Sequence, residues 1–107
     1  MGFVSESAGS NAETLFVAGG NADPSQGDRR LATIDPSNLN LSLIGQVSAT
    51  SENSPELTGT GDAELFGFYP GIFTAFVQGI DKATGAPTGQ TWAIPNGLGD
   101  QVVAWAF

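Results

Sequence analysis

Short apolar runs separated by glycine, proline and polar turns follow one another along the whole chain. Three such runs lie in the first half: TLFVA (14–18), LATID (31–35) and LNLSLIGQV (39–47). In the last run, Leu39, Leu41 and Leu43 alternate with Asn40, Ser42 and Ile44. Five of these six positions fit a two-residue period, which is typical of a half-buried strand. The pattern therefore predicts short β-strands rather than long helices.

The second half of the chain repeats this plan after 46–50 residues. Leu65-Phe66 follows Leu15-Phe16 by fifty residues, and Ile80-Asp81 follows Ile34-Asp35 by forty-six. Each Ile-Asp pair ends a predicted strand and precedes a tight turn, where an aspartate accepts hydrogen bonds from amides two residues on. A repeat of this length, with about four short strands per unit, is typical of the blades of a β-propeller.

We therefore predict an all-β fold made of two four-stranded, propeller-like blades. Residues 1–12 are an N-terminal segment, and residues 13–107 form the two-blade module. Its blades span about 13–54 and 55–101. Residues 102–107 then take the place that ELTGTGD (56–62) takes after the first blade, which predicts an inner strand of a further blade.

Two blades cannot close a ring, and they would expose large apolar faces that a monomer seldom carries. We therefore expect a homo-oligomer, a trimer or tetramer of about six or eight blades, in which residues 102–107 complete the first blade of a neighbour. The residues predicted to make this contact are hydrophobic: Val102, Val103, Trp105, Phe107, Leu15, Phe16 and Val17. Residues 2–7 (GFVSES) are the alternative inner strand of the first blade, and the tail is preferred because it is more β-prone.

Three segments carry a likeness to a known family: SPELTGTGDAELFGFYPG (54–71), QGIDKATGA (78–86) and VVAWAF (102–107). They resemble repeats of predicted β-propeller proteins of myxobacteria and their relatives, a lipoprotein-like family of unknown function. The likeness covers residues 55–107 well and 13–47 more loosely. It implies a propeller and no enzymatic role. Because the family's chains continue after the equivalent of WAF, it also implies a fragment, natural or engineered, whose parent is secreted or attached to the cell envelope.

The charge balance excludes several classes of partner. Eleven acidic residues face three basic ones, Arg29, Arg30 and Lys82, which gives a net charge of −8. Nucleic-acid binding needs a basic face, and so does an electrostatic hold on anionic lipids. No apolar run reaches the ~18 residues of a membrane-spanning helix, and the first twelve residues do not read as an intact signal peptide. We expect no nucleic-acid partner and no membrane insertion.

Histidine and cysteine are both absent, so the commonest general base and metal ligand is missing. We expect no metal, no cofactor and no enzymatic activity. The loop NADPSQGD (21–28) has oxygen ligands at a spacing that suits calcium, but it lacks the EF-hand pattern, and a solvated loop is the preferred interpretation.

Two other functions remain open. Trp92 and Tyr69 could present flat faces to sugars, with Asp62 to bind hydroxyls, which would make the chain a carbohydrate-binding, lectin-like module and a monomeric sandwich. The competing interpretation is that the aromatic residues pack between blades. Glu56 and Asp62, with Glu64 beside them, could instead act as the carboxylates of a glycoside hydrolase, although turn and strand-end positions explain them more simply.

Overall fold

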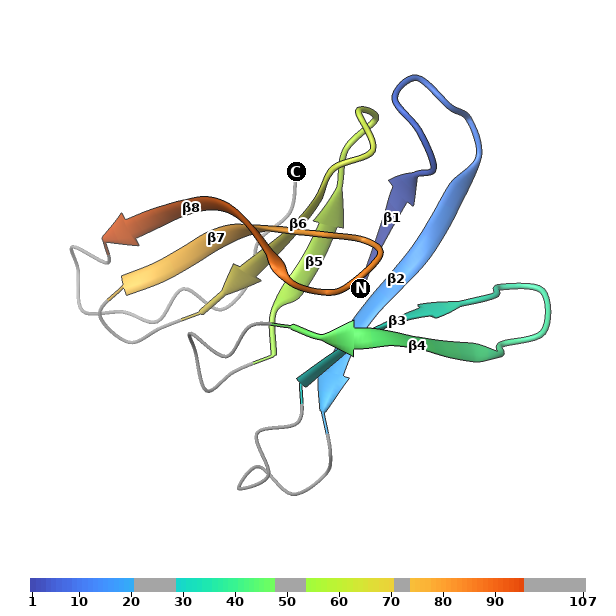
Figure 1. Cartoon of the computed structure of the whole chain (residues 1–107), viewed down its shortest axis with the longest axis horizontal. Coiled ribbons are helices and arrows are strands. Elements are labelled where there is room, and N and C mark those ends of the chain that lie inside the picture. Colours follow the sequence, from blue (N-terminus) through green and yellow to red (C-terminus); the bar gives the residue numbers. More distant parts are fainter. Residues whose placement is uncertain (21–28, 48–53, 71–73, 96–107) are drawn as a thin grey trace.

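The computed structural model describes residues 1–20, 29–47, 54–70 and 74–95. In these ranges the chain forms eight strands and no helix, arranged as two four-stranded antiparallel sheets (Figure 1). The first sheet contains β1 (Gly2–Ser5), β2 (Glu13–Gly20), β3 (Arg29–Ile34) and β4 (Leu41–Gln46). The second contains β5 (Glu56–Gly59), β6 (Leu65–Tyr69), β7 (Thr74–Ile80) and β8 (Pro87–Pro95). The prediction of an all-β fold with two four-stranded units is confirmed.

The first sheet settles which segment forms its inner strand. Its order is β1-β2-β3-β4, and β1 pairs with β2 from Gly2↔Phe16 to Ser5↔Glu13. Because β3 bonds the other edge of β2, the strand that carries Leu15, Phe16 and Val17 is already paired on both sides. The expectation that a neighbour's residues 102–107 occupy this place is corrected here, and those residues lie outside the described ranges.

A short local connection explains why β1 pairs with β2, although the sequence of β1 is less β-prone than residues 102–107. The hairpin between β1 and β2 is closed by bonds from Glu6 N to Ala12 O (2.9 Å) and from Ser10 N to Ser7 O (2.9 Å). Closing so short a loop costs little conformational entropy. Val4 is also fully buried in the core, so β1 contributes apolar packing as well as backbone bonds. Residues 2–5 therefore form a strand of the first sheet, and residues 6–12 connect it to β2.

The second sheet repeats the first in structure as well as in sequence. Its order is β5-β6-β7-β8, and the cross-strand pair Leu65↔Ile80 matches Leu15↔Ile34 of the first sheet. The turns after the two isoleucines are also equivalent. Asp35 Oδ1 accepts a bond from Ser37 N (2.9 Å), and Asp81 Oδ1 accepts bonds from the amides two and three residues on (2.8 and 3.0 Å). These two turns confirm the role predicted for the aspartates.

The two sheets pack face to face around one core. Its buried members come from both sheets: Val4, Phe16, Leu31 and Val47 from the first, and Leu57, Leu65 and Ile80 from the second. The inner strands β1 and β5 lie beside each other at its centre. A Cβ added to Gly59 would meet the Phe3 carbonyl oxygen, so the inner strands approach closely only because this position is glycine. A second buried cluster, formed by Phe66, Phe68, Ala75 and Val77, lies on the opposite side of the second sheet.

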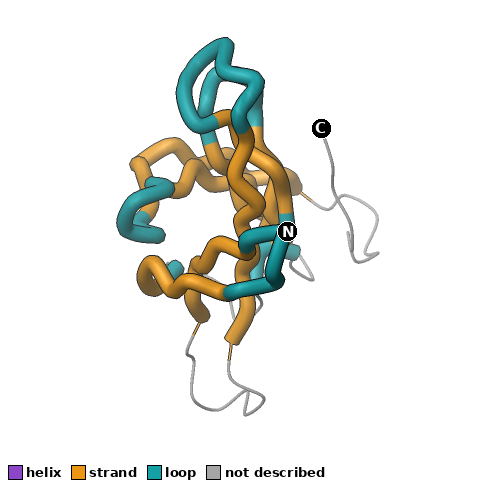
Figure 2. Tube along the Cα trace, turned by 90° about the vertical axis from the view of Figure 1, so that its right-hand side faces the viewer, coloured by secondary structure: helices purple, strands orange, loops and turns teal. Residues whose placement is uncertain are grey.

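Polar contacts hold the two sheets together around the β1–β2 turn. The β1–β2 and β5–β6 turns lie side by side at one end of the molecule (Figures 1 and 2), where Gly9 N donates to Gly61 O at 3.0 Å. The Lys82 ammonium, in the β7–β8 turn, donates to Ser5 O at 2.9 Å and to Glu6 O at 3.3 Å. These contacts fix the second sheet relative to the first.

Candidate functional site

An apolar face of the first sheet points away from the second sheet. Phe16 and Leu31 point into the core, and alternate side chains of a strand point to opposite sides, so their neighbours point outwards. Cross-strand partners share a side, which extends this outer face across all four strands. Its apolar residues are Phe3, Leu15, Val17, Ala32, Ile34, Leu41 and Leu43. We refer to these seven residues as the Leu15 face.

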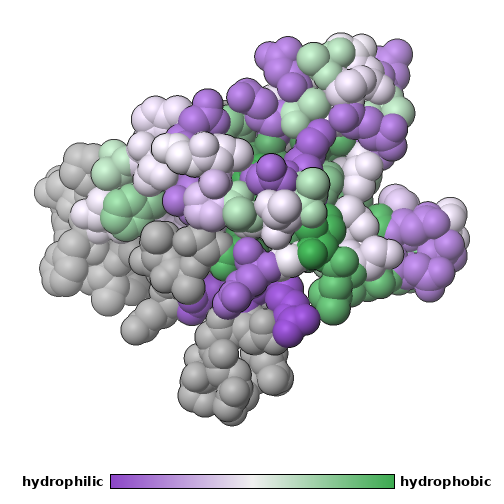
Figure 3. All heavy atoms as spheres, viewed as in Figure 1, coloured by the Kyte–Doolittle hydropathy of each residue, from purple (hydrophilic) through white to green (hydrophobic). Residues whose placement is uncertain are grey.

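The Leu15 face is hollowed and open at the surface. A hollow of ≈ 450 Å³ is lined by eight residues: Val17, Ala18, Gly19, Gly20, Arg30, Ala32, Leu41 and Leu43. Leu41 is 56% exposed and Leu43 61% exposed. Figure 3 shows hydrophobic side chains at the surface beside β4. Several large side chains therefore meet solvent on one side of one sheet, which is uncommon in a monomeric protein.

The alternation in residues 39–47 suggested a strand whose leucines form its buried side. In the structure, Leu41 and Leu43 form the exposed side instead. Leu41 and Leu43 point outwards because they pair with Ile34 and Ala32 of the Leu15 face, whereas Ile44 packs against the core. A two-residue period gives the alternation of a strand, and the pairing register decides which of its two sides is covered. The strand is half-buried, as its period predicted, but through its other face.

Trp92 and Ile94 form a second exposed apolar site, on the outer strand of the second sheet. Trp92 is 50% exposed and Ile94 36% exposed. Trp92 pairs with Val77 across the β7–β8 ladder, so it lies on the side of the second buried cluster. Its ring is tilted by 57° against that of Phe66, with centroids 5.9 Å apart. One part of the indole thus packs against the sheet while the rest meets solvent.

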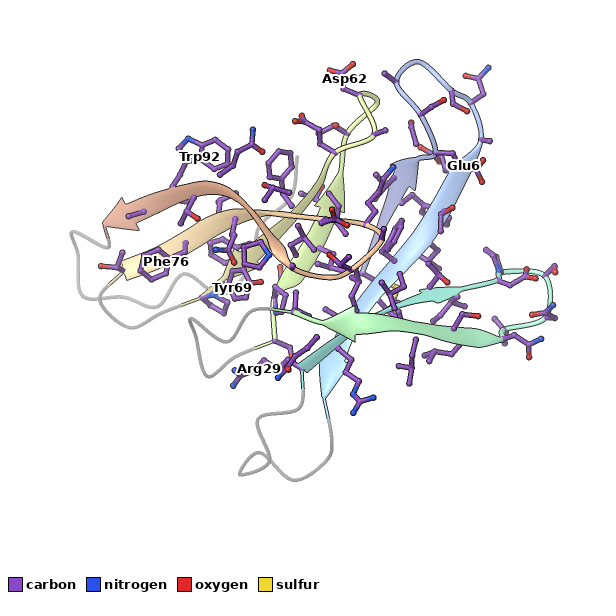
Figure 4. The ribbon with its side chains drawn as sticks, viewed as in Figure 1. Glu6, Arg29, Asp62, Tyr69, Phe76 and Trp92 are labelled. Atoms are coloured by element: carbon purple, nitrogen blue, oxygen red, sulfur yellow. The ribbon has the colours of Figure 1, made fainter. Side chains whose placement is uncertain are left out.

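The three residues predicted to bind a ligand do not come together. Tyr69 shares its side of the second sheet with Leu65, so it faces the first sheet, opposite to Trp92. Asp62 lies in the exposed β5–β6 turn, and Figure 4 shows the three residues well apart. Glycan binding by this set stays a prediction, without a shared pocket among the described residues.

Tyr69 belongs to the interior. Its side chain is fully buried, and its hydroxyl has no hydrogen-bond partner within the described part of the chain. Burial raises the pKa of Tyr69 to about 12, because the phenolate would lose its hydration, and the positive charge of Arg29 opposes this effect only in part. A neutral, buried phenol suits packing better than contact with a soluble sugar.

The acidic residues do not form a catalytic or metal-binding cluster in the parts of the chain that the structure describes. Glu56 opens β5, opposite Phe68, whereas Asp62 and Glu64 lie in or after the turn at the other end of the β5–β6 hairpin. No group of three or more potential metal-ligating side chains occurs among the described residues. The loop 21–28, considered for calcium, lies outside them, as do Val102, Val103, Trp105 and Phe107. The hydrolase alternative stays a prediction from the sequence, with Glu56 at the opposite end of the β5–β6 hairpin from Asp62 and Glu64.

Comparison with known proteins adds no further assignment. No protein-family model, curated protein or solved structure matches this chain. The likeness to bacterial propeller repeats therefore stays a prediction from the sequence. Among the described residues, no helix is long and apolar enough to cross a membrane.

Proposed function

We propose that the chain is a non-enzymatic structural module that assembles with copies of itself into a closed, propeller-like ring. The observation that carries the proposal is the way its two equivalent sheets stack. The Phe16 side of the first sheet packs on the Leu65 side of the second. Leu65 is the equivalent of Leu15, which points to the other side from Phe16, so two different faces of the same unit meet.

Such a contact between unlike faces leaves the other face of each sheet for a further unit. The first sheet keeps an exposed Leu15 face. On the Trp92 side of the second sheet, Trp92 and Ile94 stay partly exposed, whereas Phe66, Phe68, Ala75 and Val77 are buried within the single chain. Head-to-tail contacts of this kind build rings when the rotation closes. Propellers close with ~4–8 blades, so three or four copies would suffice. The proposed contact between copies is one of sheet faces, rather than the exchange of residues 102–107 with β2.

The mass of the particle in solution tests this proposal. We expect light scattering coupled to gel filtration to give one sharp species with the mass of a trimer or tetramer, independent of concentration above its dissociation range. A ring has no free faces, so larger species should not accumulate. A stable monomer over the whole range would refute the proposal, and a ladder of growing oligomers would refute closure.

A further inference from the structure

We propose that Trp92 and Ile94 of one copy insert into the hollow of the Leu15 face of a second copy. This inference rests on the proposed function and identifies the surfaces by which copies meet. The hollow would then hold two side chains of β8, and these two exposed side chains would be buried against another copy. Both surfaces consist of described residues that are partly open to solvent in the single chain.

The register of the strands shows that Ile94 and Val47 occupy the same place in the two sheets. In the first sheet, Val47 follows β4 and its amide donates to Arg29 O at 2.9 Å. In the second sheet, Ile94 pairs with Ala75, which is forty-six residues after Arg29. By the same offset, Trp92, opposite Val77, corresponds to Gly45, opposite Leu31.

The equivalent residues of the first sheet already make a contact between sheets. Val47 is fully buried and belongs to the core cluster with Leu65 and Ile80, on the inward side of the second sheet. Gly45 touches the β7–β8 turn, since an added Cβ would meet the carbonyl oxygen of Thr84. The outer strand of one sheet thus reaches onto the face of the next. Ile94 and Trp92 stand at the same positions, and the described residues form no third sheet that could receive them.

The Leu15 face of the first sheet is equivalent to the face of the second sheet that receives Val47. The counterparts of Leu65 and Ile80 on the first sheet are Leu15 and Ile34, both on the Leu15 face. The hollow lies on this face, beside them, and is lined mostly by aliphatic side chains. Continuing the stack therefore brings β8 of one copy over the hollow of the next.

Size and chemistry fit this occupant. Trp92 is far larger than the Gly45 that it replaces, so the contact between copies needs extra room, and a hollow of ≈ 450 Å³ supplies it. Aliphatic walls suit an indole and an isoleucine, because their burial removes apolar surface from water.

Two variants and two matched controls test the contact. Leu43→Lys places a charge in the hollow, and Trp92→Lys replaces the inserted ring by a charged side chain. The controls Ser42→Lys and Ala93→Lys add the same charge to exposed neighbours that point to the other side of the same strands. We expect each variant to run as a folded monomer, and each control to keep the mass of the wild-type particle.

Mixing the two variants gives the decisive result. Each keeps one intact surface, so Trp92 of the Leu43→Lys chain can enter the hollow of the Trp92→Lys chain. We expect a 1:1 heterodimer at least tenfold tighter than either variant's self-association. If like faces met instead, one variant alone would still dimerise and mixing would add nothing, which would overturn the inference.

The outcomes separate the inference from the proposed function. A wild-type oligomer that survives both substitutions would place the contact elsewhere and refute the inference, while leaving self-assembly intact. Dissociation by Leu43→Lys but not by Trp92→Lys would mean that another segment fills the hollow, which also refutes it. A monomeric wild type would refute self-assembly itself.

Fluorescence provides a second readout if Trp92→Lys fails to fold. The chain has two tryptophans, so in a Trp105→Phe background Trp92 is the one that reports. We expect its emission to lie at shorter wavelength in the assembled particle and to shift to longer wavelength in the Leu43→Lys chain. An unchanged spectrum would contradict insertion of the indole.

Discussion

Replacing Gly45 by alanine tests how closely the two sheets must approach. A Cβ at this position would collide with the carbonyl oxygen of Thr84 and lie 3.0 Å from its carbonyl carbon. These atoms belong to the backbone of the β7–β8 turn. Asp81 holds that turn through bonds from Thr84 N (3.0 Å) and Gly85 N (2.8 Å), so it cannot swing aside as a side chain could.

The expected cost follows from this geometry. Extra atoms in a tightly packed contact cost about 1–3 kcal/mol when the backbone has to shift. A small domain is stable by only ~5–15 kcal/mol, so the loss is a sizeable fraction of the total. It corresponds to a fall in melting temperature of roughly 4–20 °C for a chain of this size.

Thermal and urea unfolding followed by circular dichroism measure this effect, at one protein concentration below the range of any self-association. Gly61→Ala is the matched control, because nothing lies within 4 Å of a Cβ there and the backbone is not left-handed. We expect the control to stay within about 0.5 kcal/mol of the wild type. If Gly45→Ala does the same, the sheets do not approach as closely as the structure shows, and the reasoning fails.

Three further predictions concern polar groups. Tyr69 is the single tyrosine, and its pKa of about 12 lies above the value of an unfolded chain, so its contribution to folding stability is complete below pH 10 and falls as the pH rises towards 12. Phenolate absorbance should therefore appear only near pH 12 in the folded chain, and Tyr69→Phe should abolish this alkaline loss of stability. Lys82→Met should destabilise the fold by at most about 1.5–3 kcal/mol in urea unfolding, since it removes a charged donor to Ser5 O, and an unchanged midpoint would contradict the link. The turn hydrogen bonds lower the pKa values of Asp35 and Asp81 below 3.8, so their stabilisation is present above that pH and is lost as the pH falls through the lowered values. The double variant with alanine at both positions should show a weaker acid dependence in unfolding scans, and an unaltered acid limb would refute the assignment.

The repeat and its turns could be predicted because their causes are local. A period of two specifies a strand, and Asp35 and Asp81 shape their turns through atoms two or three residues away. The fifty-residue spacing of the two Leu-Phe pairs then showed that one unit occurs twice. These features need no knowledge of what the segments touch.

The positions of Tyr69 and Trp92 could not be read from the sequence in the same way. Whether two side chains share a side of a sheet depends on the register of strands that are joined only after folding. Tyr69 turns out to face the first sheet, and Trp92 faces away from it. Two residues that looked like parts of one binding site therefore serve different surfaces.

The sequence by itself determined the strands, their turns and the existence of two equivalent units. The tertiary structure decided which segment completes the first sheet, which leucines stay exposed and where glycine is needed between backbones. The Lys82 ammonium bonds a carbonyl seventy-seven residues away, and β1 occupies the edge of β2. Which segment pairs with a strand edge, and which side of a sheet is covered, depends on contacts between segments that are distant in the chain. These contacts form only when the chain folds.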